Sequence, residues 1–249
     1  MNALAPSNST PRLFALIPSA GHGSRSGLAA PKQYHTVAGR RIIDHTVAVF
    51  EAMPEIEQVW VVTSPGDSMY RSPSAKVKVV PVGGHTRAHS VFNGLQTLAA
   101  SGAQSSDWVL VHDAARCLVT AQDMAPLIEA CIPDAVGGIL AIPAADTLKQ
   151  AWKDETSGAS SFRSQSTLDR STVWLAQTPQ MFKLGLLLQA LEAQAANDFA
   201  GVTDESSALE LAGHRPLLVP GSAHNFKVTY PQDIAMADML LTQRQEPTP

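Results

Sequence analysis

One short segment near the start of the chain concentrates glycines and positive charges. Gly21, Gly23 and Gly27 stand within seven residues, and Arg25 and Lys32 add two cations to the same segment. Glycines allow the backbone to approach a ligand closely and to turn its amide groups toward an anion. A surface turn without a ligand would account for the glycines but not for the two cations. The segment therefore indicates a binding site for a polyphosphate.

Two common phosphate-binding patterns do not match this segment. The dinucleotide pattern G-x-G-x-x-G requires a third glycine where Ser26 stands, and no acidic residue ends the apolar run 58–63, where one would bind a ribose. The Walker pattern G-x-x-x-x-G-K-[ST] is absent as well. A nicotinamide-dependent dehydrogenase is therefore a distant alternative, which a lack of NAD(H) binding would dismiss.

The segments that must position this site alternate between short apolar runs and stretches of helical periodicity. Strands are expected at residues 13–18, 58–63, 77–82, 108–112, 138–142, 216–219 and 225–228. Helices are expected at residues 41–53, 86–100, 121–131, 184–196, 204–212 and 232–241. Strands that are apolar on both faces and alternate with helices predict an α/β fold, with a Rossmann-like, mostly parallel sheet and helices on both faces. Ligands of such sheets bind beyond the carboxyl ends of the strands, where the glycine-rich segment follows its strand.

The alternation is interrupted between residues 143 and 178, where the chain is polar, rich in serine and weakly periodic. A disordered linker would fit this composition, but strand-like pieces flank it at 144–152 and 171–178. We therefore expect 143–178 to form an extended β-arm. The remaining pattern predicts a single domain over residues 12–242, with mobile tails at 1–11 and 243–249.

The overall composition narrows the class of protein. The chain has 249 residues, of which 45% are hydrophobic and 16% charged, and its formal net charge is −4. This balance argues against a surface that binds nucleic acid throughout, although it allows a local basic cleft. The apolar runs, such as 139–145, are far shorter than the ~20 residues of a membrane span. Cys117 and Cys131 are too few for a disulfide framework or a four-cysteine zinc site, so we expect a cytoplasmic protein that binds neither membrane nor nucleic acid.

Eight motifs spread along the chain occur together, and in this order, in one enzyme family. They are ALIPSAGHGSR…APKQY, GGHTRAHSV, VHDAAR, ADTLK, TLDR, TPQMF, TDESSALE and NFKVT. The set closely resembles the 2-C-methyl-D-erythritol 4-phosphate cytidylyltransferase family of the non-mevalonate isoprenoid pathway. The resemblance implies that CTP and methylerythritol phosphate react to give a CDP-alcohol and pyrophosphate, with Mg²⁺ as cofactor. It also implies a homodimer in which the arm 143–178 crosses to the second subunit.

The resemblance also implies roles for particular residues. The catalytic residues that it implies are Arg25 and Lys32 at the α-phosphate of CTP, and Arg170 and Lys227 at the phosphate of the alcohol. The nucleotide-binding residues that it implies are Ala20, Gly21, Gly23, Gly84, Ser90, Asp113 and Ala114. The substrate-binding residues that it implies are Arg116, Thr147, Arg170, Thr178 and Lys227. Asp113 would be a ligand of the metal ion, and the CTP phosphates would supply most of its other ligands.

The implied reaction agrees with the residue types of the chain. The attacking group is a phosphate monoester, whose second pKa is ~6, so at neutral pH it needs no side chain to remove a proton. The sequence shows no evident Ser–His–Asp or paired-carboxylate motif. The remaining tasks are to bring two anions together and to stabilise an in-line transition state, which require positioning and fixed positive charge.

Several of these residues also have structural interpretations. Lys227 would simply be solvated if it lies in an alternating strand. Arg170 would form a surface ion pair with the adjacent Asp169, worth only ~0–1 kcal/mol. Asp113 would cap the segment that follows its strand. The TDE sequence at 203–205 is interpreted as the start of a helix rather than as part of a site.

A few positions depart from the family pattern or leave other chemistry open. His85 and His89 have a spacing that could hold a metal ion on a helix, but no third ligand is evident nearby, so we interpret them as polar residues around the base. His85 stands where the family commonly has an acidic residue, Cys117 where proline is usual, and Ser24 where a basic residue is frequent. None of these departures removes an implied catalytic cation.

Two other functions stay open at this point. A cytidylyltransferase for another polyol phosphate, such as ribitol 5-phosphate, would keep the CTP site and differ only in the alcohol pocket. A catalytically inactive nucleotide-binding protein on the same fold is the alternative from another class. Cations at both reacting phosphates argue against it, because binding alone does not require them.

Overall fold

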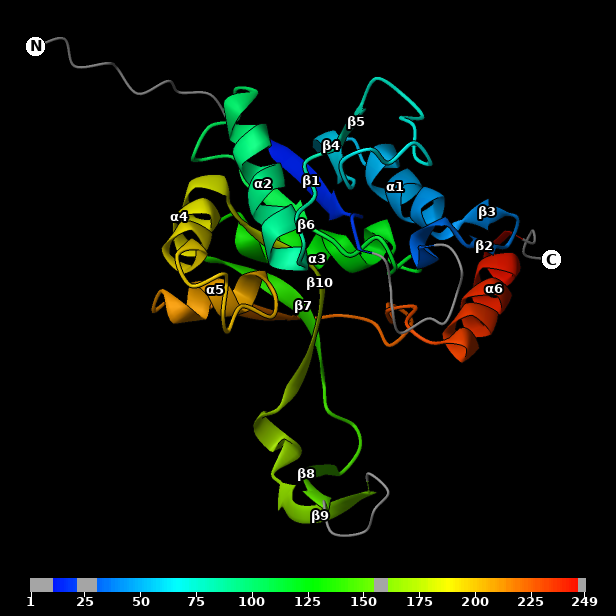
Figure 1. The fold of residues 1–249 in the computed structure, drawn as a ribbon, viewed down its shortest axis with the longest axis vertical. Coiled ribbons are helices and arrows are strands. Elements are labelled where there is room, and N and C mark those ends of the chain that lie inside the picture. The colour runs from blue at the N-terminus through cyan, green and yellow to red at the C-terminus, as the bar shows by residue number, and fades with distance from the viewer. Residues whose placement is uncertain (1–10, 22–30, 155–160, 246–249) are drawn as a thin grey trace, which may run out of the picture.

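A seven-stranded sheet forms the centre of the molecule (Figure 1). The structure is a computed structural model that describes residues 11–21, 31–154 and 161–245. The strand order is β11-β7-β10-β6-β1-β4-β5. The bounds are β1 Leu13–Pro18, β4 Ile56–Val62, β5 Val77–Val80, β6 Trp108–Val111, β7 Gly137–Pro143, β10 Trp174–Lys183 and β11 Leu217–Pro220. The predicted Rossmann-like, mostly parallel sheet is confirmed.

One strand of this sheet runs against the others. β10 lies between β6 and β7 and pairs antiparallel with both, whereas the remaining neighbours pair in parallel. The predicted arm, 143–178, therefore includes the first residues of a strand that belongs to the central sheet. The carboxyl ends of β1, β4, β5 and β6 meet at one edge, as parallel strands require.

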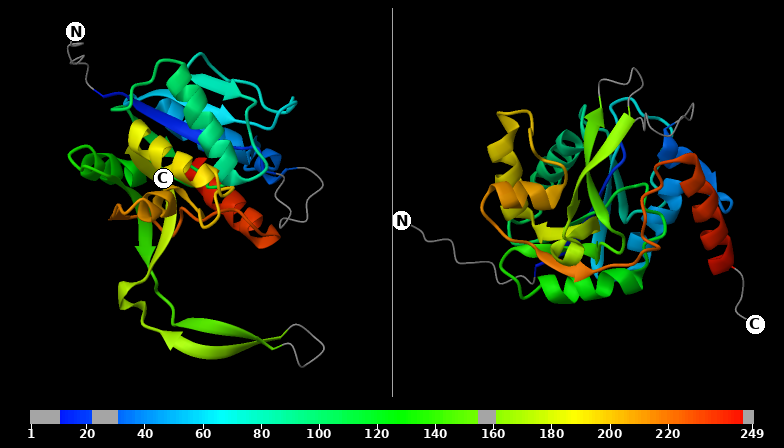
Figure 2. Two further views of the ribbon diagram at one scale, coloured as in Figure 1. Left: turned by 60° about the vertical axis from the view of Figure 1, so that its left-hand side comes forward. Right: turned by 90° about the horizontal axis from the view of Figure 1, so that it is seen from below.

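Helices cover both faces of the sheet (Figure 2). The bounds are α1 Ile42–Ala52, α2 Arg87–Ala100, α3 Ala121–Cys131, α4 Leu184–Ala195, α5 Glu205–Leu211 and α6 Pro231–Gln245. Successive residues of β1 point to opposite faces. Ala15 and Ile17 pack with α1 and α3, whereas Phe14 and Leu16 pack with α2, α4 and α5. None of the helices in the described ranges has the length and apolar character needed to span a bilayer.

Side-chain caps fix where several helices begin. The Thr86 hydroxyl accepts a hydrogen bond from the His89 amide, so α2 begins at Arg87. At the start of α5, Asp204 and Ser207 form a reciprocal capping box, which satisfies two backbone amides. This confirms that the TDE sequence marks a helix start. The segment between β1 and α1 adds short elements, namely η2 Lys32–Tyr34, β2 Thr36–Val37 and β3 Arg40–Arg41.

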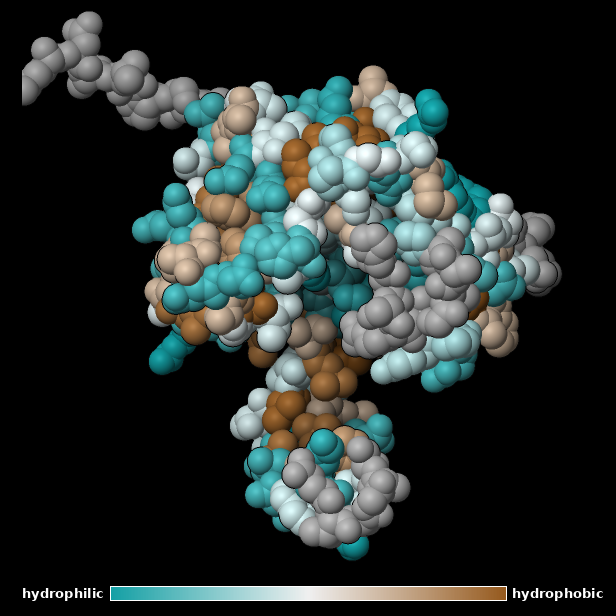
Figure 3. Space-filling view, in the orientation of Figure 1, coloured by the Kyte–Doolittle hydropathy of each residue, from teal (hydrophilic) through white to brown (hydrophobic). Residues whose placement is uncertain are grey.

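The arm projects from the edge of the body formed by β7 and β10 (Figures 1 and 2). It contains the antiparallel pair β8 Leu148–Asp154 and β9 Ser161–Leu168, followed by η3 Arg170–Thr172. Brown, hydrophobic surface is visible where the arm meets the body (Figure 3). The exposed large hydrophobic side chains of the arm and of β10 are Trp152, Phe162, Leu168 and Leu175. A two-stranded hairpin is marginally stable by itself, so a contact that buries these exposed side chains would stabilise the arm.

Two secondary-structure predictions were wrong, one for a strand and one for the length of the last helix. Residues 225–228 form no strand, because single contacts hold them instead of a ladder: the Val228 amide donates to the Ala115 carbonyl, and the Asn225 carbonyl accepts from Arg116. The last helix, expected at 232–241, runs from Pro231 to Gln245 and includes residues that were assigned to a tail. Of the expected tails at 1–11 and 243–249, residues 1–10 and 246–249 lie outside the described residues.

Candidate active site

A pocket of about 500 Å³ lies at the edge where the carboxyl ends of the parallel strands meet. Its walls come from the segments that follow β1, β4, β5 and β6, the position expected for a ligand site in an open α/β sheet. It is lined by Pro18, Ser19, Ala20, Gly21, Lys32, Gln33, Ser64, Pro65, Gly83, Gly84, His85, Thr86, Arg87, Ser90, Asp113, Ala114, Ala115 and Lys227.

Most of the nucleotide-binding residues implied by the resemblance line this one pocket. They are Ala20, Gly21, Gly84, Ser90, Asp113 and Ala114, and the implied catalytic residues Lys32 and Lys227 lie there with them. Four separate segments of the chain contribute these residues, so their convergence is a property of the fold. Gly23 and Arg25 lie outside the described residues.

The turn after β5 requires glycine because of close backbone approach. A Cβ atom on Gly83 would lie 2.8 Å from the Thr63 carbonyl oxygen and would collide with the Cβ of Ala20. The next residue, Gly84, donates its amide to the Ser90 hydroxyl at 3.1 Å. The Ser90 hydroxyl donates in turn to the Thr86 carbonyl, so the turn and the first helical turn of α2 form one unit.

Asp113 is the centre of a charged network on the pocket floor. Its carboxylate accepts from Arg87 Nε at 2.8 Å and from Lys227 Nζ at 2.8 Å, and Arg116 Nε lies 3.8 Å away. Burial alone would raise the pKa of Asp113, but the charges of Arg87 and Lys227 outweigh it and hold this pKa well below its usual range. Asp113 is therefore ionised at every pH near neutrality.

Arg87 and Glu205 complete this network, although the sequence predicted no site role for Arg87 and only a helix start for Glu205. The Arg87 guanidinium forms two hydrogen bonds to the Glu205 carboxylate, at 2.7 and 2.9 Å. Glu205 is only 2% exposed and sits in the first turn of α5, where a negative charge is favourable. Both residues belong to motifs that carried the family resemblance, GGHTRAHSV and TDESSALE. The motifs therefore contained both residues, but the sequence alone does not show that residues 118 apart pair with each other.

Lys32 and Lys227 are connected through the segment that follows Asn225. Lys32 Nζ donates to the Val228 carbonyl at 2.8 Å, and the Val228 amide donates to Ala115 beyond the end of β6. Two lysines that are far apart in sequence are thereby brought to one pocket. Gln33 fixes the other side of this segment, because its amide donates to the carbonyls of Ser19 and Gly21.

Arg116 and Thr178 lie behind the pocket rather than in its wall. The Asp113 amide donates to the Thr178 hydroxyl at 3.0 Å, and Thr178 is only 4% exposed. Arg116 donates to the Asn225 carbonyl at 2.6 Å, and its Nε is buried without a hydrogen-bond partner. Thr178 therefore holds the backbone of Asp113 in place, and Arg116 holds the segment that bears Lys227.

His112 precedes Asp113 and is fully buried. One ring nitrogen lies 3.1 Å from the Arg116 carbonyl oxygen and the other 3.1 Å from the Thr178 hydroxyl. Burial lowers the pKa of His112 to about 3, so the ring is neutral at physiological pH. With both nitrogens engaged, His112 is a structural residue and not an acid–base catalyst.

The structure places Arg170 and Thr147 away from this pocket. Both are exposed on the arm, and Arg170 donates to the Ala145 carbonyl. They do not come together with Lys227 within this chain.

A single carboxylate in the pocket suits one kind of metal site. Mg²⁺ is usually held by one or two carboxylates together with substrate phosphates and water. Asp113 supplies one carboxylate that lines the pocket, and its permanent ionisation keeps it competent as a ligand. Its two oxygens face Arg87 and Lys227, so a metal here would depend on phosphate oxygens for most of its coordination.

Comparisons with known proteins agree on one family. A family model described as "IspD: 2-C-methyl-D-erythritol 4-phosphate cytidylyltransferase" matches residues 13–243. A protein of that name from Burkholderia cenocepacia is 48% identical over 237 residues, covering 94% of this chain and 98% of the relative. A bifunctional enzyme IspD/IspF from Albidiferax ferrireducens is 51% identical over 246 residues; the match covers 97% of this chain and 56% of that relative, so the chain spans little more than half of its length.

The three-dimensional comparison agrees as well. A crystal structure described as 4-diphosphocytidyl-2C-methyl-D-erythritol synthase has a TM-score of 0.80 and 40% sequence identity, covering 94% of this chain and 100% of that chain. The likeness therefore extends over the sheet, its helices and nearly all of the described residues.

Proposed function

The chain belongs to the 2-C-methyl-D-erythritol 4-phosphate cytidylyltransferase family, and from this premise we propose how its pocket performs the reaction. The reaction transfers a cytidylyl group from CTP to 2-C-methyl-D-erythritol 4-phosphate. A phosphate oxygen of the alcohol phosphate attacks the α-phosphorus of CTP, the bond to the β-phosphate breaks, and pyrophosphate leaves. The observation that carries the proposal is the convergence of Lys32, Lys227 and Asp113 in one pocket beyond the parallel strands.

No base is required in this mechanism. The attacking phosphate is mostly a dianion at neutral pH, because its second pKa is ~6. The obstacle is the repulsion between two anions, which fixed cations reduce before and during the transfer. Lys32 is proposed to stabilise the transition state at the α-phosphate, together with Arg25, which the family resemblance implies.

The nucleotide is proposed to lie along the glycine-rich edge of the pocket. Backbone amides around Ala20, Gly21 and Gly23 would hold the triphosphate, since such amides bind anions well. A Cβ atom on Gly21 would meet nothing within 4 Å, so packing does not require glycine there, which suits a ligand-binding role. Gly84 and Ser90 would contact the base, and Asp113 and Ala114 the ribose.

The alcohol phosphate is proposed to bind between Lys227 and the arm of a second subunit. Lys227 is fixed by Asp113, and Arg170 and Thr147 would reach the same phosphate from the partner's arm. Arg116 and Thr178 would contribute by holding Asp113 and the segment that bears Lys227. Exposed hydrophobic side chains on the arm support a homodimer, because a contact that covers them would stabilise the arm.

Nucleotidyltransferases typically use a divalent metal ion, and we propose Mg²⁺ for this enzyme. Asp113 and the CTP phosphates would hold it, and it would supply charge neutralisation at the triphosphate. We further propose that residues 12–242 act as one catalytic unit and that the protein is cytoplasmic, where CTP is available and where free thiols such as those of Cys117 and Cys131 stay reduced.

A CTP-dependent assay of pyrophosphate release tests the proposed function. With purified protein and Mg²⁺, we expect rapid release with methylerythritol phosphate and little release with ribitol 5-phosphate. Preference for ribitol 5-phosphate would show that the alcohol specificity is wrong while the CTP chemistry is right. Binding of CTP without release in the presence of either alcohol would identify an inactive nucleotide-binding protein.

A further inference from the structure

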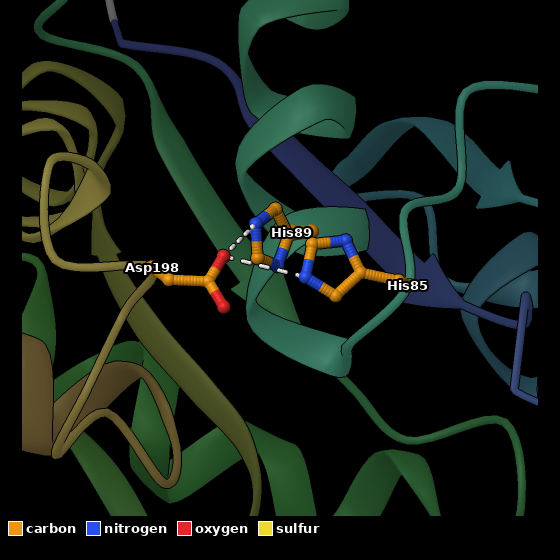
Figure 4. A group of neighbouring side chains, drawn as sticks. All are labelled: His85, His89 and Asp198. Atoms are coloured by element: carbon orange, nitrogen blue, oxygen red, sulfur yellow. Dashed lines mark ion pairs between the residues drawn. The ribbon is translucent and has the colours of Figure 1, made fainter.

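A group of three potential metal ligands lies beside the pocket, outside the set of residues used above. The side chains of His85, His89 and Asp198 point toward one another (Figure 4). Their ligand atoms all lie within 4.8 Å of one another. We propose that they form a binding site for a divalent transition-metal ion, with Zn²⁺ as the ion that the ligand set favours.

The distances within the group match those around a tetrahedral ion. Asp198 Oδ1 lies 3.0 Å from His89 Nε2 and 3.3 Å from His85 Nε2. Two ligands at the usual Zn–N and Zn–O bond lengths lie about 3.4 Å apart when they subtend a tetrahedral angle. Both contacts of Asp198 are therefore within a few tenths of an ångström of this spacing, and the two histidine ligand atoms lie within 4.8 Å of each other.

The start of α2 orients one of the ligands, His89, in advance. His89 Nδ1 lies 2.7 Å from the Thr86 hydroxyl, which directs Nε2 toward Asp198. Hydrogen bonding of the second ring nitrogen is characteristic of histidines that bind metals. The two histidines do not lie on one helical face, as their spacing suggested, because α2 begins at Arg87 and His85 precedes it.

Asp198 is presented by a tight turn after α4. Asp198 and Phe199 have φ values of 54° and 57°, in the left-handed region that non-glycine residues seldom adopt. Phe199 is buried and packs edge-on against the His89 ring, with centroids 4.6 Å apart. This packing fixes the turn, so the third ligand, which the sequence did not reveal, is held beside the two histidines.

The chemistry of the ligands separates this site from the proposed Mg²⁺ position. Two imidazoles and one carboxylate suit Zn²⁺ and its transition-metal neighbours, whereas Mg²⁺ prefers oxygen ligands alone. The N-terminus of α2 disfavours a nearby cation, and the Asp198 carboxylate supplies the opposing charge. Since His85 also lines the pocket, the ion would tie the turn at residues 197–202 to the rim of the nucleotide site.

Zn²⁺ titration of the untagged, metal-free full-length protein tests this site by calorimetry in excess Mg²⁺. We expect one saturable site per chain, weakened at least tenfold by His85→Ala and by Asp198→Asn. Both side chains are largely exposed, at 65% and 73%, and asparagine tolerates the left-handed backbone, so these variants should fold. His224→Ala is the matched control, because His224 is exposed and belongs to no such group in the described ranges.

A second measurement keeps the result independent of catalysis. Co²⁺ in place of Zn²⁺ should give the visible absorption bands of a tetrahedral site in the wild-type protein and in His224→Ala, and these bands should be lost in Asp198→Asn. Absence of saturable Zn²⁺ binding would overturn the proposal, as would binding that is equally strong in His85→Ala and Asp198→Asn. Neither outcome depends on whether the protein is an active transferase.

Discussion

Replacement of Lys227 by methionine is expected to damage the use of the alcohol phosphate far more than the use of CTP. Methionine keeps most of the length of the side chain but removes the ammonium group that lies 2.8 Å from Asp113. A hydrogen bond from a charged donor contributes about 1.5–3 kcal/mol, which corresponds to a loss of roughly 10- to 150-fold in kcat/KM for methylerythritol phosphate. We expect the KM for CTP to change less than threefold.

The same substitution has a calculable effect on stability. Asp113 keeps Arg87 as a partner, and the Lys227 side chain is 33% exposed, so the lost ion pair lies between the surface and buried cases. The expected decrease in the free energy of unfolding is about 1–2 kcal/mol. Urea denaturation would measure it, and the kinetics must be compared at a temperature where the variant is fully folded.

Steady-state kinetics with each substrate varied in turn would test the assignment. Lys78→Met is the matched control, because Lys78 is an exposed lysine on β5 that does not line the pocket. It should leave both KM values and the stability nearly unchanged. An increase confined to the KM for CTP in Lys227→Met would show that Lys227 serves the nucleotide, and the proposed division of the pocket would be wrong.

Four further results are expected. Lys32→Ala should lower kcat by about 10²–10³-fold, measured at saturating substrates, with the circular dichroism spectrum unchanged. Arg25→Ala should lower kcat at least as much, and near-normal turnover would refute its implied role. Burial lowers the pKa of His112 to about 3, so the contribution of the neutral ring to the free energy of unfolding should be fully present above pH 6.5 and decline as the pH falls toward 3. The expected decrease at pH 5 is about 2 kcal/mol. Urea unfolding of His112→Gln should lack this decrease. Phe162→Asp should convert the proposed homodimer to a monomer, as measured by light scattering, and a dimer mass that the substitution leaves unchanged would argue against the arm as the interface.

The sequence predicted the parts of the fold that periodicity determines. The strand at 13–18 and the helix at 121–131 agree with the structure at both ends, because the strand is a continuous apolar run and the helix buries one face, Met124, Leu127 and Cys131, at helical spacing. The prediction of a strand at 225–228 was wrong, because an alternating pattern also fits an extended segment that packs over the end of a sheet. The prediction of β10 was incomplete, because the insertion of an antiparallel strand between parallel ones depends on tertiary packing and leaves no periodic signal in the sequence.

The candidate site divides in the same way. Motifs identified Lys32, Asp113 and Lys227, since these residues lie in recognisable strings. The supporting pair Arg87–Glu205 was missed, because a contact between α2 and α5 depends on how two helices pack on one face of the sheet. Pairings of this kind become visible only when the distances are known.

This supporting pair explains how the pocket keeps its positive charges in place before substrate arrives. Without Glu205, Asp113 would be the carboxylate left to pair with Arg87, and less of its hydrogen-bonding capacity would be available for Lys227. With Glu205 neutralising Arg87, Asp113 retains an oxygen for Lys227 while remaining ionised. Charges that are fixed during folding need no rearrangement when two phosphates meet, and in the proposed mechanism, which needs no proton transfer, this preorganisation would be the main source of catalysis.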